Sequence, residues 1–178
     1  VSGRAVIEGL KSAGHEVFGS DISPADLAAL DRPADVVFPV LHGAWGESGE
    51  LQEILEQRGL PFVGSGSEGS RLGMNKVETK RVWEKNGLPT PGYKVLTLAT
   101  YREAEGLEAL GISAPCVVKA IDSGSSIDVF ICKNAGDAHK AIGIVLSRHA
   151  KVLIEKFING AELTVGILEE KALAPIRI

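Results

Sequence analysis

Apolar residues in this chain recur at two spacings, every three to four residues and every second residue, so both helices and strands are predicted. Helical spacing with cap or stop residues predicts helices over residues 4–13, 50–58, 75–86, 101–110 and 134–148, and Ser23 before Pro24 predicts one more helix start. Short β-type runs predict strands over residues 15–18, 35–41, 60–63, 93–98, 115–120, 127–132, 151–157, 162–168 and 171–178. Asn159-Gly160 predicts the hairpin turn that precedes the return strand 162–168.

The order of these elements predicts two parts. Up to residue 72, strands and helices alternate through short loops, which is typical of a parallel α/β sheet, and the apolar run 35–41 is typical of a strand buried on both faces. Such a unit should begin with a strand, and here the first helix has none before it. We therefore predict a parallel α/β N-terminal domain over residues 1–72. We predict an α+β domain with antiparallel strands over residues 73–178, divided near residue 150 into a central part and a last part.

The totals describe an ordinary globular protein, with 44% hydrophobic and 24% charged residues among 178. The net charge of −4 argues against a nucleic-acid partner, and no apolar run approaches the roughly 20 residues that span a bilayer. The first residues lack the architecture of a signal peptide. Cys116 and Cys132 lie in β-type runs, which predicts two buried free thiols in a reducing cytoplasm and leaves a disulfide between them open.

A loop of small residues, 121–126, lies between two predicted strands, the first of which contains Lys119. Unhindered backbone N–H groups beside a lysine are what a polyphosphate needs, although a flexible hairpin loop with a solvated lysine fits the same residues. No Walker A motif is present. The polar, glycine-rich loop 42–49 follows a predicted central strand, where α/β sheets place ligands. His42 in this loop is either a ligand-binding residue or a capping or packing residue. In the helix 75–86, three of the four basic residues Lys76, Lys80, Arg81 and Lys85 are expected on a solvated face.

Six segments, in this order, resemble the D-alanine–D-alanine ligase family of the ATP-grasp superfamily. They are residues 37–49 ("VFPVLHGxxGEDG" in the family), 61–66 ("PYVGSG"), 74–80 ("MDKxxTK"), 87–91 ("GIPTP"), 117–126 ("VKPxxxGSSxG") and 152–162 ("VLVExFIxGxE"). The chain departs from the pattern at Ala120, where the family usually has proline, and at Asp128, where it usually has glycine. An aspartate near the terminal phosphate adds repulsion unless it points away or meets Mg²⁺.

The resemblance implies ATP and Mg²⁺ as cofactors and gives roles to individual residues. Lys76 and Lys119 would hold ATP phosphates, and Ser125 and Ser126 would lie on a mobile loop over the phosphates and the reacting carboxylate. His42 and Glu47 would orient the first D-alanine, so these two residues and Ser125 are the catalytic candidates. The adenine pocket and the ribose site would be formed by Glu155, Lys156, Phe157, Ile158 and Glu162.

The implied reaction phosphorylates one D-alanine on its carboxylate and joins it to a second, giving D-Ala-D-Ala for peptidoglycan precursors in a cytoplasmic homodimer. The family's first strand with its glycine-rich loop is expected before Val1, and its Mg²⁺ ligands and transition-state arginine after Ile178. The chain alone is therefore expected to be an inactive fragment with no metal-ligand set. Two alternatives are another ATP-grasp ligase with a different second substrate and a truncated, non-catalytic nucleotide-binding module.

Overall fold

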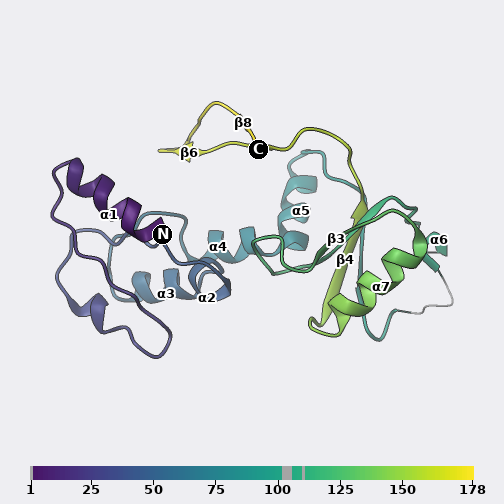
Figure 1. Ribbon diagram of the computed structural model, residues 1–178, viewed down its shortest axis with the longest axis horizontal. Helices are drawn as coiled ribbons and strands as arrows, with labels where there is room; N and C mark the ends of the chain where they lie inside the picture. Colours follow the sequence, from purple (N-terminus) through teal and green to yellow (C-terminus); the bar gives the residue numbers. More distant parts are fainter. Residues whose placement is uncertain (1, 102–105, 110) are drawn as a thin grey trace. The chain divides into compact units, whose positions relative to one another are not determined.

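The computed structural model describes residues 2–101, 106–109 and 111–178 (Figure 1). The chain forms two compact units, Val1–Thr90 with Ala120–Asp128, and Pro91–Lys119 with Val129–Ile178. The loop after the strand that carries Lys119 thus belongs to the first unit. The predicted boundary near residue 73 concerns the domains of the whole protein and stays a prediction.

The second unit is built on an antiparallel sheet. Its strands are β1 (Tyr93–Thr97), β2 (Cys116–Ala120), β3 (Val129–Cys132) and β4 (Lys151–Lys156), in the order β1-β4-β2-β3. β1 pairs with β4 and β2 with β3, both antiparallel. Side chains alternate between the two faces of a strand, and in β2 the small apolar residues Cys116, Val118 and Ala120 are completely buried while Lys119 is not. The predicted strands 93–98, 115–120, 127–132 and 151–157 are confirmed, with shorter ends.

Helix α7 (Ala135–Leu146) packs on this sheet. It contacts β3 and β4 and buries Ala138, Ala141, Ile142, Val145 and Leu146. Asn134 caps it, because its side-chain oxygen accepts the Asp137 N–H at 2.9 Å. This confirms the predicted helix and its cap. The predicted helix 101–110 lies partly outside the described residues. The part of it that the structure describes is α6 (Gly106–Ala109).

The two cysteines are cross-strand partners in the β2–β3 pair, and both are buried free thiols, as predicted. Burial is the main reason that the pKa of Cys132 rises to about 11, and burial also raises the pKa of Cys116. A thiol with a raised pKa carries little of the reactive thiolate at neutral pH. The pair is therefore a packing feature of the sheet.

The first unit is mainly helical. It contains α1 (Ser2–Ser12), the 3₁₀ helix η1 (Ala28–Asp31), α2 (Ala44–Glu47), α3 (Glu50–Gln57), α4 (Ser67–Met74) and α5 (Lys76–Lys85). α1, α3 and α5 confirm predicted helices, and Gly14 and Gly59 follow α1 and α3 at positive φ, as helix-terminating glycines do. Leu51 and Leu55 of α3 supply the buried apolar side chains of this helix.

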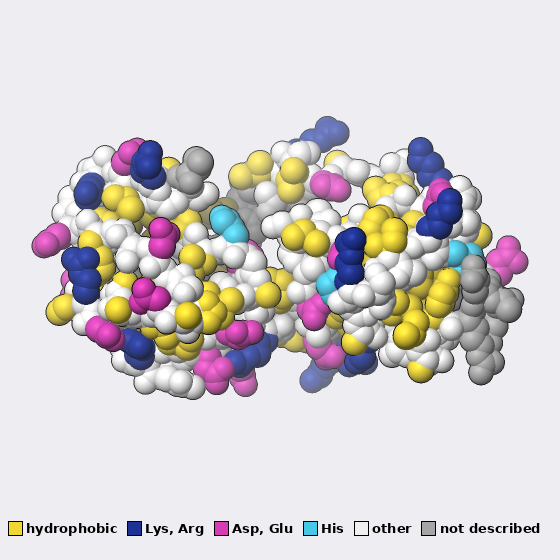
Figure 2. Space-filling model, turned by 60° about the horizontal axis from the view of Figure 1, so that its bottom comes forward, with side chains coloured by type: hydrophobic (Ala, Val, Ile, Leu, Met, Phe, Trp, Pro, Cys, Tyr) yellow, Lys and Arg dark blue, Asp and Glu magenta, His cyan; other side chains and the backbone are white. Residues whose placement is uncertain are grey.

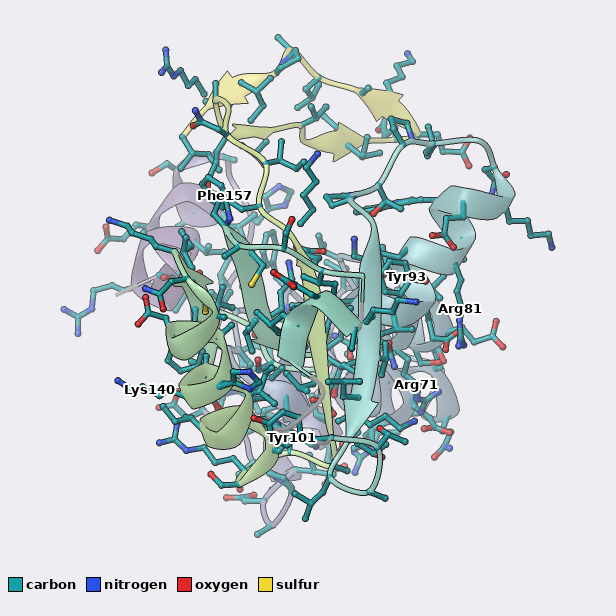
Figure 3. All side chains as sticks on the ribbon, turned by 90° about the vertical axis from the view of Figure 1, so that its right-hand side faces the viewer. Arg71, Arg81, Tyr93, Tyr101, Lys140 and Phe157 are labelled. Carbon is teal, nitrogen blue, oxygen red and sulfur yellow. The ribbon has the colours of Figure 1, made fainter. Side chains whose placement is uncertain are left out.

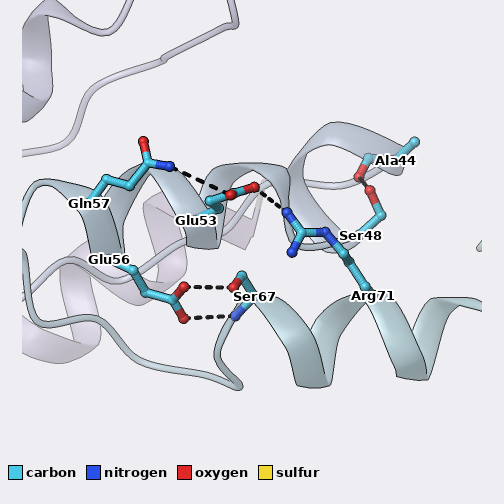
Figure 4. Close-up of polar contacts among 7 residues, drawn as sticks. All are labelled: Ala44, Ser48, Glu53, Glu56, Gln57, Ser67 and Arg71. Carbon is cyan, nitrogen blue, oxygen red and sulfur yellow. Dashed lines mark hydrogen bonds and ion pairs between the residues drawn. The ribbon is translucent and has the colours of Figure 1, made fainter.

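The sequence pattern does not predict α4, whose stabilising contacts come from α3. The Ser67 N–H and hydroxyl donate to the two oxygens of Glu56 at 2.8 and 2.6 Å, so a distant carboxylate caps α4 (Figure 4). These two hydrogen bonds hold the pKa of Glu56 below its usual value, and the bond from the Ser67 hydroxyl has the larger effect. Arg71 of α4 forms an ion pair with Glu53 of α3 (Figure 4).

The strands predicted for the N-terminal part are mostly wrong. Residues 15–18 form no strand, and the runs 35–41 and 60–63 meet in a single parallel bridge, Val37 to Phe62. Val36 and Phe38 are 53% and 44% exposed, so this run is not covered on both faces. Proline cannot donate to a ladder, and Pro39 and Pro61 both lie at this bridge. The parallel sheet is not formed by the described residues.

Two further predictions also fail. Residues 23–26 form a turn closed by a Ser23–Asp26 bridge instead of a helix start, and the Asp26 side chain accepts the Ala28 N–H at the beginning of η1. The Asn159-Gly160 hairpin is absent among the described residues. Instead β5 (Leu163–Thr164) pairs with β8 (Ile176–Arg177) and β6 (Ile167–Leu168) with β7 (Lys171–Ala172). The tight turn lies at Glu169-Glu170, both at positive φ, which is the geometry of a two-residue hairpin.

On the face drawn in Figure 2, basic and acidic side chains are interspersed. Across residues 2–101, 106–109 and 111–178, no helix is both long enough and apolar enough to cross a membrane.

Candidate functional site

Lys119 of β2 and Glu155 of β4 form an ion pair across neighbouring strands of the second unit. Their side chains are only 19% and 9% exposed, so the charges interact away from bulk water. Both residues are predicted at the ATP site from separate segments, one as a phosphate ligand and one in the adenine pocket. The structure brings them into direct contact, which the sequence does not indicate. A half-buried ammonium held by a carboxylate is a fixed positive charge that can meet a phosphate.

The segment after Glu155 is tied to the fold through its backbone. The Lys156 N–H donates to the Gly92 carbonyl at 3.1 Å, and the Phe157 N–H donates to the Pro115 carbonyl at 3.3 Å. Phe157, which is labelled in Figure 3, directly follows β4 and is half-buried. The Lys156 and Ile158 side chains are exposed. The backbone of Lys156 and Phe157, which are predicted in the adenine pocket together with Ile158, is therefore held in place next to Glu155 by hydrogen bonds.

Glu162, the predicted ribose ligand, follows this segment in the sequence. It is exposed at the start of the β5–β8 ribbon, where its carbonyl accepts the Ile178 N–H at 3.0 Å.

In the first unit, Lys76 contacts the loop 121–128. Its ammonium donates to the Ser123 carbonyl at 2.6 Å and to the Ile121 carbonyl at 3.4 Å, and its backbone N–H donates to the same Ile121 carbonyl at 3.0 Å. Asn75 caps α5 by accepting the Val77 and Glu78 N–H groups, which fixes Lys76 at the first position of the helix. The structure thus brings together Lys76 and the loop that carries Ser125 and Ser126.

The loop is held in an unusual backbone conformation. Ser125, Ser126 and Asp128 have φ values of 51°, 57° and 54°, a region in which residues other than glycine are uncommon. The Ser123 hydroxyl donates to the Ile127 carbonyl at 2.8 Å, and the Ile127 N–H donates to the Gly124 carbonyl at 3.0 Å. Asp128 occupies a position where the family usually has glycine. Its φ is positive, and glycine adopts positive φ more readily than other residues. Aspartate is among the residues that tolerate this region best.

Glu47 also lies beside this loop, and His42 does not share its contacts. A Glu47 oxygen accepts the Gly43 N–H at 2.7 Å, and the same oxygen would be 3.8 Å from a Cβ built at Gly124. His42 is exposed, one residue before Gly43. Of the two residues predicted to orient D-alanine, Glu47 is therefore placed at the glycine-serine loop by its contacts.

The basic face of α5 differs from the prediction. Arg81 and Lys85 are exposed, but Lys80 is only 4% exposed and its ammonium donates to the Thr90 hydroxyl at 2.7 Å. Sequence reasoning missed this buried lysine. The signal for it was the match of Lys80 to the second lysine of the family's "MDKxxTK" segment.

The described residues do not fit a magnesium site. No group of three or more His, Cys, Asp or Glu side chains in residues 2–101, 106–109 and 111–178 is close enough to hold a metal ion. Magnesium prefers several oxygen ligands in octahedral geometry. The described residues therefore supply no complete set of ligands for Mg²⁺.

Comparison with known proteins gives a consistent result. Residues 82–178 match the family model described as "D-ala D-ala ligase C-terminus", and residues 11–65 match "D-ala D-ala ligase N-terminus". The D-alanine–D-alanine ligase of Gloeobacter violaceus is 41% identical over 181 residues, covering 100% of this chain and 59% of that protein. The ligase of Marinobacter nauticus is 42% identical over 176 residues, covering 98% of this chain and 53% of that protein.

Solved structures agree with the sequence matches. The D-alanine–D-alanine ligase of Bacillus anthracis aligns with a TM-score of 0.77 and 32% identity, over 87% of this chain and 50% of that one. A structure of the same ligase complexed with ATP aligns with a TM-score of 0.70 and 32% identity, over 81% of this chain and 48% of that one. The chain spans little more than half the length of the curated relatives it matches.

Proposed function

Because the chain belongs to the D-alanine–D-alanine ligase family, we propose that the whole protein joins two D-alanines to D-Ala-D-Ala with ATP, for peptidoglycan precursors. The observation that carries this proposal is the ion pair between Lys119 and Glu155. Two residues assigned to one ATP site by separate sequence motifs are in contact across neighbouring strands. Their contact supports the proposal that both segments belong to one site.

The phosphates of ATP would be held by two lysines and by backbone N–H groups. Lys119 offers an ammonium that Glu155 orients, and Lys76 offers one at the first turn of α5, beside the loop of Ser125 and Ser126. Consecutive residues at positive φ turn backbone N–H groups toward a common side, which suits an anion. Each hydrogen bond to a charged oxygen contributes about 1.5–3 kcal/mol.

The base and sugar of ATP would lie along the edge that follows Glu155. The N–H groups of Lys156 and Phe157 already donate within the fold, so reading of the adenine edge falls to carbonyl groups and to Ile158. The half-buried Phe157 ring offers an apolar surface for the base. Glu162 would accept from the ribose hydroxyls once the ribbon that follows β4 is in place over the nucleotide.

The first D-alanine would be oriented by Glu47 and His42. Glu47 is fixed by the Gly43 N–H and lies next to Gly124, so its carboxylate faces the loop over the reacting groups. A carboxylate at this place suits the ammonium of an amino acid, and His42 is exposed on the same glycine-rich segment. Ser125 would hydrogen-bond the carboxylate that receives the phosphoryl group.

The reaction would proceed in two balanced steps. A carboxylate oxygen of the first D-alanine attacks the terminal phosphorus, and ADP leaves. The amine of the second D-alanine then attacks the acyl carbon, loses a proton, and expels phosphate with the former carboxylate oxygen. The lysines stabilise the charge on the transferring group, and the loop keeps water from the acyl phosphate.

The remaining features of the whole protein are part of the same proposal. We propose that residues 1–72 are part of a parallel α/β domain of the whole protein, which the parallel Val37–Phe62 bridge supports. An ATP-grasp domain would begin at residue 73, and its parts would meet near residue 150. Mg²⁺ ligands and the transition-state arginine would follow Ile178. The whole protein would act as a cytoplasmic homodimer, and the chain alone would be inactive.

A test of this proposal measures ADP formation by the purified whole protein with ATP and Mg²⁺. Addition of D-alanine is expected to start ADP formation and to yield D-Ala-D-Ala. ADP formation that needs a D-hydroxy acid or another amino acid as the second substrate would show a sister ATP-grasp ligase instead. Nucleotide binding without any substrate-dependent ADP would show a non-catalytic binding module, and L-alanine serves as the matched control substrate.

A further inference from the structure

Lys76 makes more contact with the glycine-serine loop than a phosphate-binding role requires. Its backbone N–H and its ammonium both reach the Ile121 carbonyl, and the ammonium also reaches the Ser123 carbonyl at 2.6 Å. A hydrogen bond from an ionised donor is shorter and stronger than a neutral one. One residue of α5 thus holds two loop carbonyls that lie 45 and 47 positions away in the sequence.

The loop needs such external support because its own backbone conformation is unfavourable. Ser125, Ser126 and Asp128 occupy the positive-φ region, and such residues persist where the surrounding structure holds them. The hydrogen bonds inside the loop close the turn from residue 123 to residue 127. They do not attach this turn to another element, whereas the bonds from Lys76 attach its first residue to α5.

The loop also lies close to two other helices of the first unit. Gly124 lies close to Glu47 of α2 and Met74 of α4, since a Cβ built there would be 3.8 Å from a Glu47 oxygen and 4.0 Å from the Met74 methyl carbon. The loop therefore lies beside α2 and α4, and hydrogen bonds from Lys76 attach it to α5.

We propose that Lys76 is a positioning residue that orders the 121–128 loop even when no nucleotide is bound, in addition to any contact with phosphate. Its consequence for catalysis rests on the proposed function, but the ordering does not. Lys76 presets the positive-φ conformation in which Ser125 and Ser126 present their N–H groups. Loss of Lys76 then loosens the loop in the absence of nucleotide and lowers kcat as well as weakening ATP binding.

Hydrogen–deuterium exchange on the whole protein without nucleotide tests this proposal. In Lys76→Met, exchange of the loop amides, including Ile127, is expected to be about tenfold faster, because loss of one charge-assisted bond shifts local opening by about that factor. Lys85→Met, a change of the same size at an exposed lysine of the same helix, should leave the loop unchanged. Lys76→Arg, which keeps a charged donor, should recover much of the protection.

Amides of α7 report whether the change is local. Loop exchange in Lys76→Met equal to that of the unchanged protein would overturn the proposal, and so would an equal acceleration in the loop and in α7. Since no nucleotide is present, this result stands apart from the ligase assay. A protein without D-alanine-dependent ADP formation could still show the loop effect, and an active ligase could lack it.

Discussion

The substitution Lys119→Ala is expected to lower kcat/KM for ATP of the whole protein by about one to two orders of magnitude. In the proposed site it would remove charge-assisted hydrogen bonds to phosphate, each of which contributes about 1.5–3 kcal/mol. Initial rates of D-alanine-dependent ADP formation over a series of ATP concentrations measure the effect. Lys94→Ala is the matched control, because Lys94 is an exposed lysine in β1 of the same sheet and no role in the site is proposed for it. An ATP dependence in Lys119→Ala equal to that of the unchanged protein would remove Lys119 from the phosphate site.

Lys119→Ala also breaks the ion pair with Glu155, so its effect on stability must be separated from its effect on ATP use. Removal of one partner from a fully buried pair costs about 3–5 kcal/mol, and the partly exposed Lys119–Glu155 pair should lose less. The double variant Lys119→Met with Glu155→Gln leaves no buried charge uncompensated. It should recover most of the stability in urea unfolding but not the use of ATP. Recovery of both would mean that Lys119 acts through folding alone.

The substitution Gly49→Ala is expected to lower the free energy of unfolding by about 2–4 kcal/mol. Gly49 has φ +96°, and a Cβ there would lie 2.5 Å from the Ser67 carbonyl oxygen and 2.7 Å from Arg71 Cγ. The Ser67 oxygen is backbone, so the beginning of α4 would have to move away from the residues that precede α3. Urea unfolding of the whole protein, followed by a probe in the first unit, measures the loss.

Gly59→Ala separates the two causes of this loss. Gly59 also has positive φ, +64°, but no atom lies within 4 Å of a Cβ built there. Its substitution should cost only the backbone term, about 1–2 kcal/mol. If Gly49→Ala costs no more than Gly59→Ala, the close contact with α4 contributes nothing to stability.

Local signals explain which helices and strands could be predicted. Asn75 and Asn134 cap the helices that follow them with their own side chains, so both starts are readable within three residues of sequence. α4 has no such signal, since its cap is Glu56, 11 positions earlier, and glycines at 69 and 73 weaken the helical pattern. The predicted strand 35–41 reduces to one bridge because a run of apolar residues specifies a strand only where other elements cover it.

The candidate site could be predicted only in part for a similar reason. The motifs assign Lys119 and Glu155 to one ligand, but their contact depends on β4 lying beside β2 in the sheet, which is a non-local property. The burial of Lys80 against Thr90 likewise depends on the path of the chain after α5. From the sequence, Asp128 is notable only as an added negative charge. The structure shows in addition that the backbone at this position has a positive φ.

We propose that the whole protein activates the carboxylate of D-alanine as an acyl phosphate. D-alanine labelled with oxygen-18 in its carboxyl group tests it most directly, with ATP and the purified whole protein, by mass spectrometry of the released phosphate. The two-step reaction predicts that each phosphate released with D-Ala-D-Ala carries one labelled oxygen, because the bond broken by the amine joins that oxygen to the acyl carbon. Unlabelled phosphate would contradict the acyl phosphate and the role given to the loop over it.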